Sequence, residues 1–161
     1  MTNFLHTDLY PFLKPLEDNW EQIKTEFLGI PKDDFEKYFV DELHNGKWKV
    51  WGLYYQQQWF LEHMQQCPKT TELIQQIPGL SEAGFSILEA GAKLEPHVGW
   101  TDQFMRCHLP LICTPKAYLS VEGEQYIWTE GKIVVFDDMK EHYAVNESDI
   151  DRVVLIVDFK K

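Results

Sequence analysis

The first eighty residues carry apolar positions at helical spacing. Between residues 15 and 30 these positions recur three and four residues apart, and acidic residues come early, where the N-terminus of a helix favours them. The apolar positions are Leu16, Trp20, Ile23 and Phe27. The pattern predicts an amphipathic helix over residues 15–30.

Three further segments of this half have a pattern of their own. A short helix is expected over residues 33–39. Another is expected over residues 68–80, because Pro68 can open a helix and the Pro78–Gly79 pair can end it. Residues 48–60 are aromatic and β-prone but contain a glycine, which predicts short pieces of strand.

After residue 80 the pattern changes to short strands separated by turn signals. Many short strands at close spacing are typical of a sandwich or barrel, including the double-sheet jelly roll. The fold class expected for the chain is therefore mainly β with flanking N-terminal helices. The predicted strands cover residues 84–90, 103–113, 117–122, 125–129, 132–137, 141–146 and 152–159.

Composition narrows the class of protein. The 161 residues, 44% hydrophobic and 25% charged, fit one folded domain. A formal net charge of −11 argues against a nucleic-acid partner, because such proteins concentrate Lys and Arg on one surface. No segment approaches the roughly 18 apolar residues of a membrane span, and no signal-peptide pattern is present. We therefore expect a cytoplasmic protein whose cysteines are free thiols, with Cys107 and Cys113 buried.

One stretch, residues 95–111, places two of the six histidines and an arginine in an apolar, strand-like context. Burial of histidine or arginine is costly unless the side chain is paired or binds something. Strand alternation puts Phe104, Arg106 and His108 on one face. Taken singly, a strand histidine is more often a packing residue and an edge arginine is usually solvated. A jelly roll could bring five such side chains into one cavity: His97, Arg106, His108, His142 and Arg152.

Three motifs in a fixed order resemble the aspartyl/asparaginyl β-hydroxylase family. They are FSILEAGAKLEPHVGWTDQFMRCHLPL, GKIVVFDDMKEH and RVVLIVDF. The resemblance is strong over residues 80–160 and looser before them. It implies a single oxygenase domain over residues 1–161, in which residues 1–80 pack on a double-stranded β-helix, the cupin-like jelly roll, of residues 81–161. It also implies an iron(II)- and 2-oxoglutarate-dependent dioxygenase that uses O2.

The same resemblance assigns roles to six residues. The histidines of the "PH-x-G" and "FDD…EH" motifs are His97 and His142, which would be the two iron ligands. Imidazole nitrogen suits iron(II), and two protein ligands leave positions open for cosubstrate and oxygen. Guanidinium groups pair with carboxylates through two hydrogen bonds and can do so when buried. The residues that would hold the two carboxylates of 2-oxoglutarate are Ser86, Arg106, His108 and Arg152.

The third iron ligand is open on the sequence. Most oxygenases of this superfamily carry Asp or Glu two residues after the first histidine, where this chain has Gly99. A water is expected in that position. Asp102 is a weaker alternative because of its spacing, and a halide would fill the position in a halogenase. Asp137 and Asp138 could orient the nearby ligands, or they could simply form a turn.

The leading interpretation is a hydroxylase that acts on an unactivated carbon of a small-molecule, peptide, carrier-bound or acyl substrate, with no nucleic acid and no membrane span involved. The alternatives are a 2-oxoglutarate-dependent halogenase and a non-catalytic cupin-like module that binds a dicarboxylate. The presence of both histidines argues against the module. The remaining histidines, His6, His44 and His63, are expected on the surface or as packing residues. Trp100 and Trp128 could line the substrate entrance or belong to the core.

Overall fold

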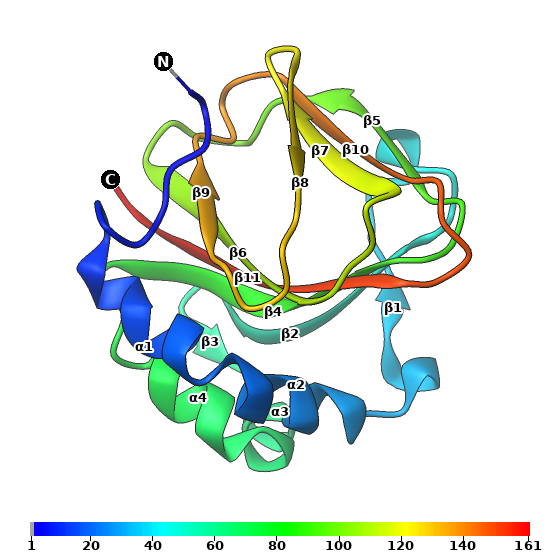
Figure 1. Cartoon of the computed structure of the whole chain (residues 1–161). Helices are drawn as coiled ribbons and strands as arrows, with labels where there is room; N and C mark the ends of the chain where they lie inside the picture. The colour runs from blue at the N-terminus through cyan, green and yellow to red at the C-terminus, as the bar shows by residue number, and fades with distance from the viewer. Residues whose placement is uncertain (1) are drawn as a thin grey trace.

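The chain folds into two antiparallel β-sheets that face each other, with helices on the outer face of the larger sheet (Figure 1). The computed structural model describes residues 2–161. The larger sheet has seven strands in the order β1-β2-β4-β11-β6-β9, with β3 paired to β2. The smaller sheet has four strands in the order β5-β10-β7-β8. This arrangement is the predicted one: mainly β, with flanking helices.

The helices are η1 (Pro11–Leu13), α1 (Lys14–Asp18), α2 (Trp20–Leu28), η2 (Lys32–Asp34), η3 (Asp41–Leu43), α3 (Leu61–Gln66) and α4 (Pro68–Ile74), where η marks a single 3₁₀ turn. The strands of the first half are β1 (Glu36–Lys37), β2 (Trp48–Tyr55), β3 (Gln58–Trp59), β4 (Leu80–Leu88) and β5 (Lys93–His97). The remaining strands are β6 (Phe104–Ile112), β7 (Ala117–Val121), β8 (Glu124–Ile127), β9 (Val134–Phe136), β10 (His142–Asn146) and β11 (Arg152–Lys160).

The central strand β11 separates two hydrophobic cores. Val153, Leu155 and Val157 belong to the core shared with the helices, whereas Val154 and Ile156 belong to the core between the sheets. Successive side chains of a strand point to opposite faces, so a strand buried on both faces is apolar throughout. The same alternation turns the polar residues at the two ends of β11 toward the space between the sheets.

The predicted helix over residues 15–30 is present as two helices. Helix α1 ends before Asn19, which serves as the N-cap of α2. The Leu16 and Ile23 side chains are fully buried against the larger sheet, as the spacing predicted. Helix α4 lies within the predicted residues 68–80 and begins at Pro68.

The prediction of a helix over residues 33–39 is wrong. One 3₁₀ turn is followed by Phe35 in an extended conformation, and then by β1. Strand β1 pairs with the edge of β2, with Glu36 opposite Val50. An edge strand has unpaired backbone groups, and pairing with them outweighed a weak helical pattern with a single buried side chain. Among the α-helices and the strands longer than two residues, α3 and β5 were not predicted.

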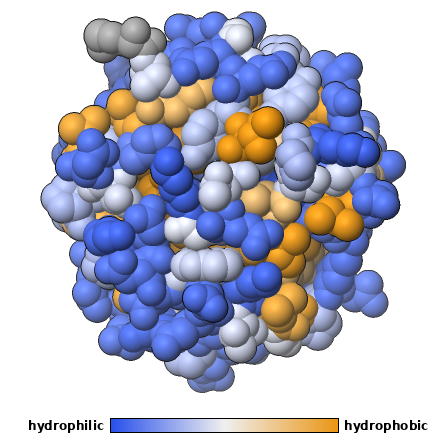
Figure 2. All heavy atoms as spheres, in the orientation of Figure 1, coloured by the Kyte–Doolittle hydropathy of each residue, from blue (hydrophilic) through white to orange (hydrophobic). Residues whose placement is uncertain are grey.

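All three cysteines are free thiols. Cys107 is buried as predicted, but Cys113 is only partly buried, with its Sγ 3.2 Å from the carbonyl oxygen of Trp128. Burial raises the pKa of Cys67 to about 12 and the pKa of Cys113 to about 11, so these thiols are protonated at neutral pH. The face of the molecule in Figure 2 is mostly hydrophilic, with separate apolar patches. Over residues 2–161, no helix has both the length and the apolar character that crossing a membrane requires.

Candidate active site

Two histidines meet on the smaller sheet. Strands β5 and β10 are antiparallel, and His142 lies directly opposite His97. Directly opposed residues point to the same face of a sheet. The two ring centroids are 4.3 Å apart, and both rings line a cavity between the sheets. The fold thus brings together two side chains that are 45 positions apart in the sequence.

Both rings are held by the same kind of backbone contact. Nδ1 of His97 is 2.6 Å from the carbonyl oxygen of Glu95, and Nδ1 of His142 is 2.9 Å from that of Lys140. A carbonyl oxygen only accepts, so each Nδ1 carries a proton and each Nε2 keeps a lone pair. Burial lowers the pKa of His97 and lowers the pKa of His142 to about 4. Two adjacent neutral imidazoles with free Nε2 atoms are a suitable donor set for a metal ion.

Among residues 2–161, the buried cation Arg152 has no anionic partner. Its residue surface is 2% exposed, and its Nε makes no hydrogen bond. Its Nη2 donates to the backbone oxygen and the Oγ of Ser86, at 3.3 and 3.2 Å, and the guanidinium lies 4.6 Å from the ring centroid of Trp128. Burial lowers the pKa of Arg152. Because an unpaired buried charge is costly, this side chain indicates a site for an anionic ligand.

Two tryptophans orient the neighbours of this arginine. Trp48 Nε1 donates to Ser86 Oγ at 2.9 Å, and Trp128 Nε1 donates to Nδ1 of His108 at 3.2 Å. Since Nδ1 of His108 accepts, its Nε2 carries the proton in the neutral ring. Burial and the nearby arginines lower the pKa of His108 well below its usual value, so the ring is neutral. The cavity therefore contains a guanidinium and an imidazole N–H donor, both suited to carboxylate oxygens.

Arg106, the second arginine predicted to hold a carboxylate, is already paired. Its Nε and Nη2 donate to the two carboxylate oxygens of Asp158, at 2.9 and 2.8 Å, across the β6–β11 ladder. Glu82 lies 3.6 Å from the same Nη2. Arg106 lines both the inner cavity and a larger groove outside it. Its charge is neutralised within the protein, unlike that of Arg152.

A carboxylate occupies the space beside Gly99. A Cβ at this position would lie 2.5 Å from Oδ2 of Asp138 and 2.6 Å from its Cγ. The backbone N–H of Gly99 donates to the Asp138 carbonyl at 2.7 Å, whereas the carboxylate itself has no hydrogen-bond partner among residues 2–161. Asp137 has the turn role instead, since its Oδ1 accepts from the Met139 N–H. Asp138 therefore lies close to where the carboxylate of a His-x-Asp motif would begin.

Asp102 does not join the two histidines. It is exposed and lines neither the cavity nor the groove. In the part of the chain that the structure describes, no three His, Cys, Asp or Glu side chains are grouped closely enough to hold a metal ion. A metal bound here would have two protein ligands, His97 and His142.

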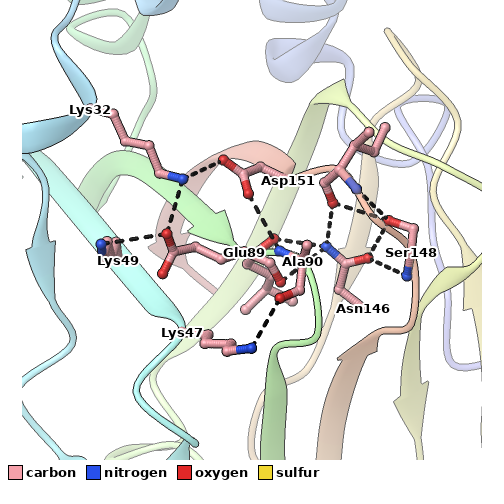
Figure 3. Close-up of polar contacts among 10 residues, drawn as sticks. Lys32, Lys47, Lys49, Glu89, Ala90, Asn146, Ser148 and Asp151 are labelled. Atoms are coloured by element: carbon pink, nitrogen blue, oxygen red, sulfur yellow. Dashed lines mark hydrogen bonds and ion pairs between the residues drawn. The ribbon is translucent and has the colours of Figure 1, made fainter.

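A polar network ties together the strand ends that carry Ser86 and Arg152 (Figure 3). The buried Asn146 donates to backbone carbonyls at the end of β4, at 2.9 Å, and before β11, at 2.8 Å. Lys32 of the helical layer bridges Glu89 and Asp151, at 2.9 Å each. These contacts hold the ends of β4 and β11 in register beside the cavity.

Comparison with known proteins identifies the family. Residues 17–161 match the family described as Aspartyl/Asparaginyl beta-hydroxylase. The chain belongs to this family. It is 43% identical over 103 residues to the ornithine lipid ester-linked acyl 2-hydroxylase of Rhizobium tropici. The aligned region covers 62% of this chain and 37% of that relative. It is 31% identical over 157 residues to the aspartyl/asparaginyl beta-hydroxylase of Homo sapiens, which covers 91% of the chain and 20% of that protein.

The chain thus spans well under half the length of these two hydroxylases. Its membership in the family confirms the resemblance found in the sequence motifs. Two solved structures share the fold. A predicted oxalate decarboxylase from Thermotoga maritima has a TM-score of 0.55 at 13% identity, covering 79% of this chain and 92% of that one. A cupin 2 conserved barrel domain protein from Salinispora arenicola has a TM-score of 0.50 at 15% identity, covering 81% and 87%. The cupin-like jelly-roll fold is confirmed.

For this member of the β-hydroxylase family, the six predicted site residues all line the inner cavity. Trp48 was not predicted, although strand pairing places it opposite Leu88, on the face of Ser86. Trp128 is buried in the core between the sheets, and Trp100 is 80% exposed at the outer groove. The other three histidines lie outside the cavity, each bonded to a backbone carbonyl as packing residues: His6, His44 and His63.

Proposed function

We propose that this chain is an iron(II)- and 2-oxoglutarate-dependent hydroxylase, in which residues 1–161 act as one oxygenase domain. The observation that carries the proposal is the buried, unpaired guanidinium of Arg152, which lines the same cavity as the paired histidines. A buried cation and two neutral imidazoles together suit a metal ion and an anionic cosubstrate.

Each residue of the cavity has a role in this proposal. His97 and His142 would hold the iron through Nε2. Arg152, with Ser86 oriented by Trp48, would pair with one carboxylate of 2-oxoglutarate, and the N–H of His108 would donate to a cosubstrate oxygen. The bound iron and 2-oxoglutarate would supply, with O2, the oxidation that hydroxylates a C–H bond of the substrate and releases succinate and CO2.

The cosubstrate also requires room. The cavity is narrow, about 30 Å³, so a five-carbon dicarboxylate would have to push the side chains that line it apart. Arg106 lies at the outer end of the cavity and is bound to Asp158. We therefore expect Arg152 to contribute more than Arg106 to the binding of 2-oxoglutarate.

Asp138 favours hydroxylation over halogenation. Its carboxylate fills the space beside Gly99, where a halide would need to approach the metal. A carboxylate repels an anion, but it accepts hydrogen bonds from a metal-bound water. We expect Asp138 to orient such a water in the third position.

The substrate classes considered are a small amino acid, a peptide, a carrier-bound group and an acyl chain. The names of the two relatives support two of these classes. One relative is named for the acyl chain of a lipid, and the other is named for aspartyl and asparaginyl residues.

The test is succinate formation from 2-oxoglutarate by protein loaded anaerobically with iron(II) and then exposed to O2. Iron-dependent succinate formation, with or without a substrate, is expected. The His97→Ala and His142→Ala variants should lose iron binding, measured by metal analysis after gel filtration, whereas the control Asp102→Ala should keep it. Absence of iron-dependent turnover with every substrate class would refute the proposal. Metal-independent binding of 2-oxoglutarate without turnover would favour a dicarboxylate-binding module.

A further inference from the structure

A pair of aromatic rings leads from the inner cavity toward the surface. Trp48, at the start of β2, is buried and lines the cavity. Its ring stacks on the ring of Tyr38, with the centroids 3.8 Å apart and the planes 3° from parallel. Tyr38 follows β1 directly and is half-buried. The stack therefore borders the candidate iron site at one end and reaches solvent at the other.

Contacts with the backbone and with His44 fix this stack. The backbone N–H of Tyr38 donates to the Trp48 carbonyl at 2.9 Å. Nδ1 of His44 accepts from the N–H of Gly46, and Nε2 lies 2.9 Å from the Tyr38 carbonyl, so Nε2 carries the proton. The His44 ring meets both aromatic rings edge-on, at 6.3 and 5.9 Å between centroids. Since both of its nitrogens are bonded to the backbone, His44 holds the rings in place and is not a base for the Tyr38 phenol.

The neighbours of Trp48 make it the more easily oxidised tryptophan beside the cavity. Tryptophan and tyrosine lose an electron more readily than other aromatic side chains, and electrons pass rapidly between rings in contact. The guanidinium of Arg152 lies 4.6 Å from the ring centroid of Trp128, and a positive charge opposes the removal of an electron from that ring. Trp48 instead donates its Nε1 proton to the hydroxyl of Ser86, which is a poor base. An oxidised Trp48 therefore keeps its proton and can recover an electron from Tyr38.

We propose that Tyr38 and Trp48 form an electron relay, which reduces the oxidant made from iron(II), 2-oxoglutarate and O2 when no substrate is bound. This inference rests on the proposed function for the source of the oxidant. The relay protects the cavity, because an oxidant without a substrate otherwise attacks the side chains around it.

The relay transfers two electrons in two steps. In each step Trp48 gives one electron to the oxidant and recovers one from Tyr38. Burial raises the pKa of Tyr38, so the phenol is protonated at neutral pH and releases its proton to water when it is oxidised. A one-electron donor of the ascorbate class in solution then reduces the phenoxyl radical, which takes back a proton. Two such steps, with two protons from water, convert the oxygen atom of the oxidant to water and restore iron(II).

The test uses the full chain loaded with iron(II), without substrate and without ascorbate. In one arm 2-oxoglutarate and O2 produce the oxidant, and in the other arm hydrogen peroxide produces one at the same metal. Samples frozen during the reaction are examined by electron paramagnetic resonance, and peptide mass spectrometry then locates the oxidised residues. We expect a tyrosyl radical in both arms, and we expect ascorbate to abolish its signal.

Two variants make the test specific. Tyr38→Phe keeps a ring that can stack on Trp48 but removes the phenol, so the tyrosyl signal should be lost and oxygen should be added to Trp48. The control Tyr54→Phe removes a phenol from the same strand β2. The Tyr54 ring also lies beside a tryptophan, 4.7 Å from Trp59, but it lines neither the cavity nor the outer groove. This control should behave as the wild type.

Three results would each overturn the inference. The first is a wild-type protein without a tyrosyl signal. The second is equal oxidation of Trp48 in the wild type and in Tyr38→Phe. The third is a tyrosyl signal that persists in Tyr38→Phe and disappears in Tyr143→Phe, because Tyr143 lines the cavity from the smaller sheet and would then be the electron donor.

The relay and the hydroxylase proposal fail in different ways. Iron-dependent succinate formation without a tyrosyl signal overturns the relay and leaves the hydroxylase intact. A signal that depends on Tyr38 in the peroxide arm, in a protein without iron-dependent succinate formation, supports the relay and overturns the hydroxylase proposal.

Discussion

Replacement of Gly99 by alanine tests whether Asp138 takes the place of the missing carboxylate. The Gly99 backbone is outside the left-handed region, so alanine adds no backbone strain there. Its Cβ would lie 2.5 Å from Oδ2 of Asp138, whereas ordinary contact begins at 3.4 Å, so the carboxylate must retreat by about 1 Å. Overpacking typically costs about 1–3 kcal/mol. The Asp138 carboxylate has no hydrogen bond to break within residues 2–161. We therefore expect Gly99→Ala to lower the free energy of unfolding by about 1 kcal/mol.

The assay is a double-mutant cycle of Gly99→Ala and Asp138→Ala, followed by thermal unfolding and by iron-dependent succinate formation. Gly99→Ala should lower Tm by about 2–4 °C in the wild-type background and by almost nothing in Asp138→Ala. Its turnover should fall to the level of Asp138→Ala, because both changes displace the same carboxylate. Gly29→Ala is the control, since its Cβ would meet only the Glu26 carbonyl at 3.4 Å. If Gly99→Ala lowered Tm equally in the wild-type and Asp138→Ala backgrounds, the reasoning would be refuted.

Three further results are expected. Arg152→Met should weaken 2-oxoglutarate binding about 100-fold in titrations and yet not lower the stability of the metal-free protein, because it removes a buried, unpaired charge; normal affinity would contradict this. Asn146→Ala should destabilise the fold by about 2–3 kcal/mol in urea, since it leaves buried carbonyls at the ends of β4 and β11 unpaired; a loss under 0.5 kcal/mol would argue against this. Burial raises the pKa of Glu82 from its ordinary 4.5 to about 7, so the folded state holds this proton more tightly and wild-type stability declines as pH rises between these values. In Glu82→Gln this decline in stability should be smaller by about 1 kcal/mol, a value reduced for solvent screening because the Glu82 side chain is 39% exposed. Parallel Tm profiles of the variant and the wild type from pH 5 to 8 would contradict this.

The contrast between the two arginines shows how one sequence signal can have two outcomes. Arg106 and Arg152 were predicted for the same task from the same motif resemblance. Both reach the cavity, but Asp158 neutralises the first, and within the described residues the second has no carboxylate beside it. The affinity for a carboxylate ligand therefore depends on neighbours that the motif does not contain.

Local periodicity was sufficient for most of the architecture. The alternation in residues 104–109 placed Arg106 and His108 on one face, and the apolar run of residues 152–159 indicated a strand, which the structure contains as β11. The spacing of Leu16 and Ile23 indicated an amphipathic helix. These features are determined by the repeat of the helix and the strand, which the order of residues along the chain expresses directly.

The tertiary structure decided what depends on contacts between distant segments. The edge of β2 converted residues 36–37 into a strand, against their weak helical pattern. Strand register set His142 opposite His97, and the turn after β9 brought the Asp138 carboxylate into the space beside Gly99. Such contacts join residues tens of positions apart, and their geometry follows from which strands pair and in which register, a property of the packed sheet that no local pattern contains.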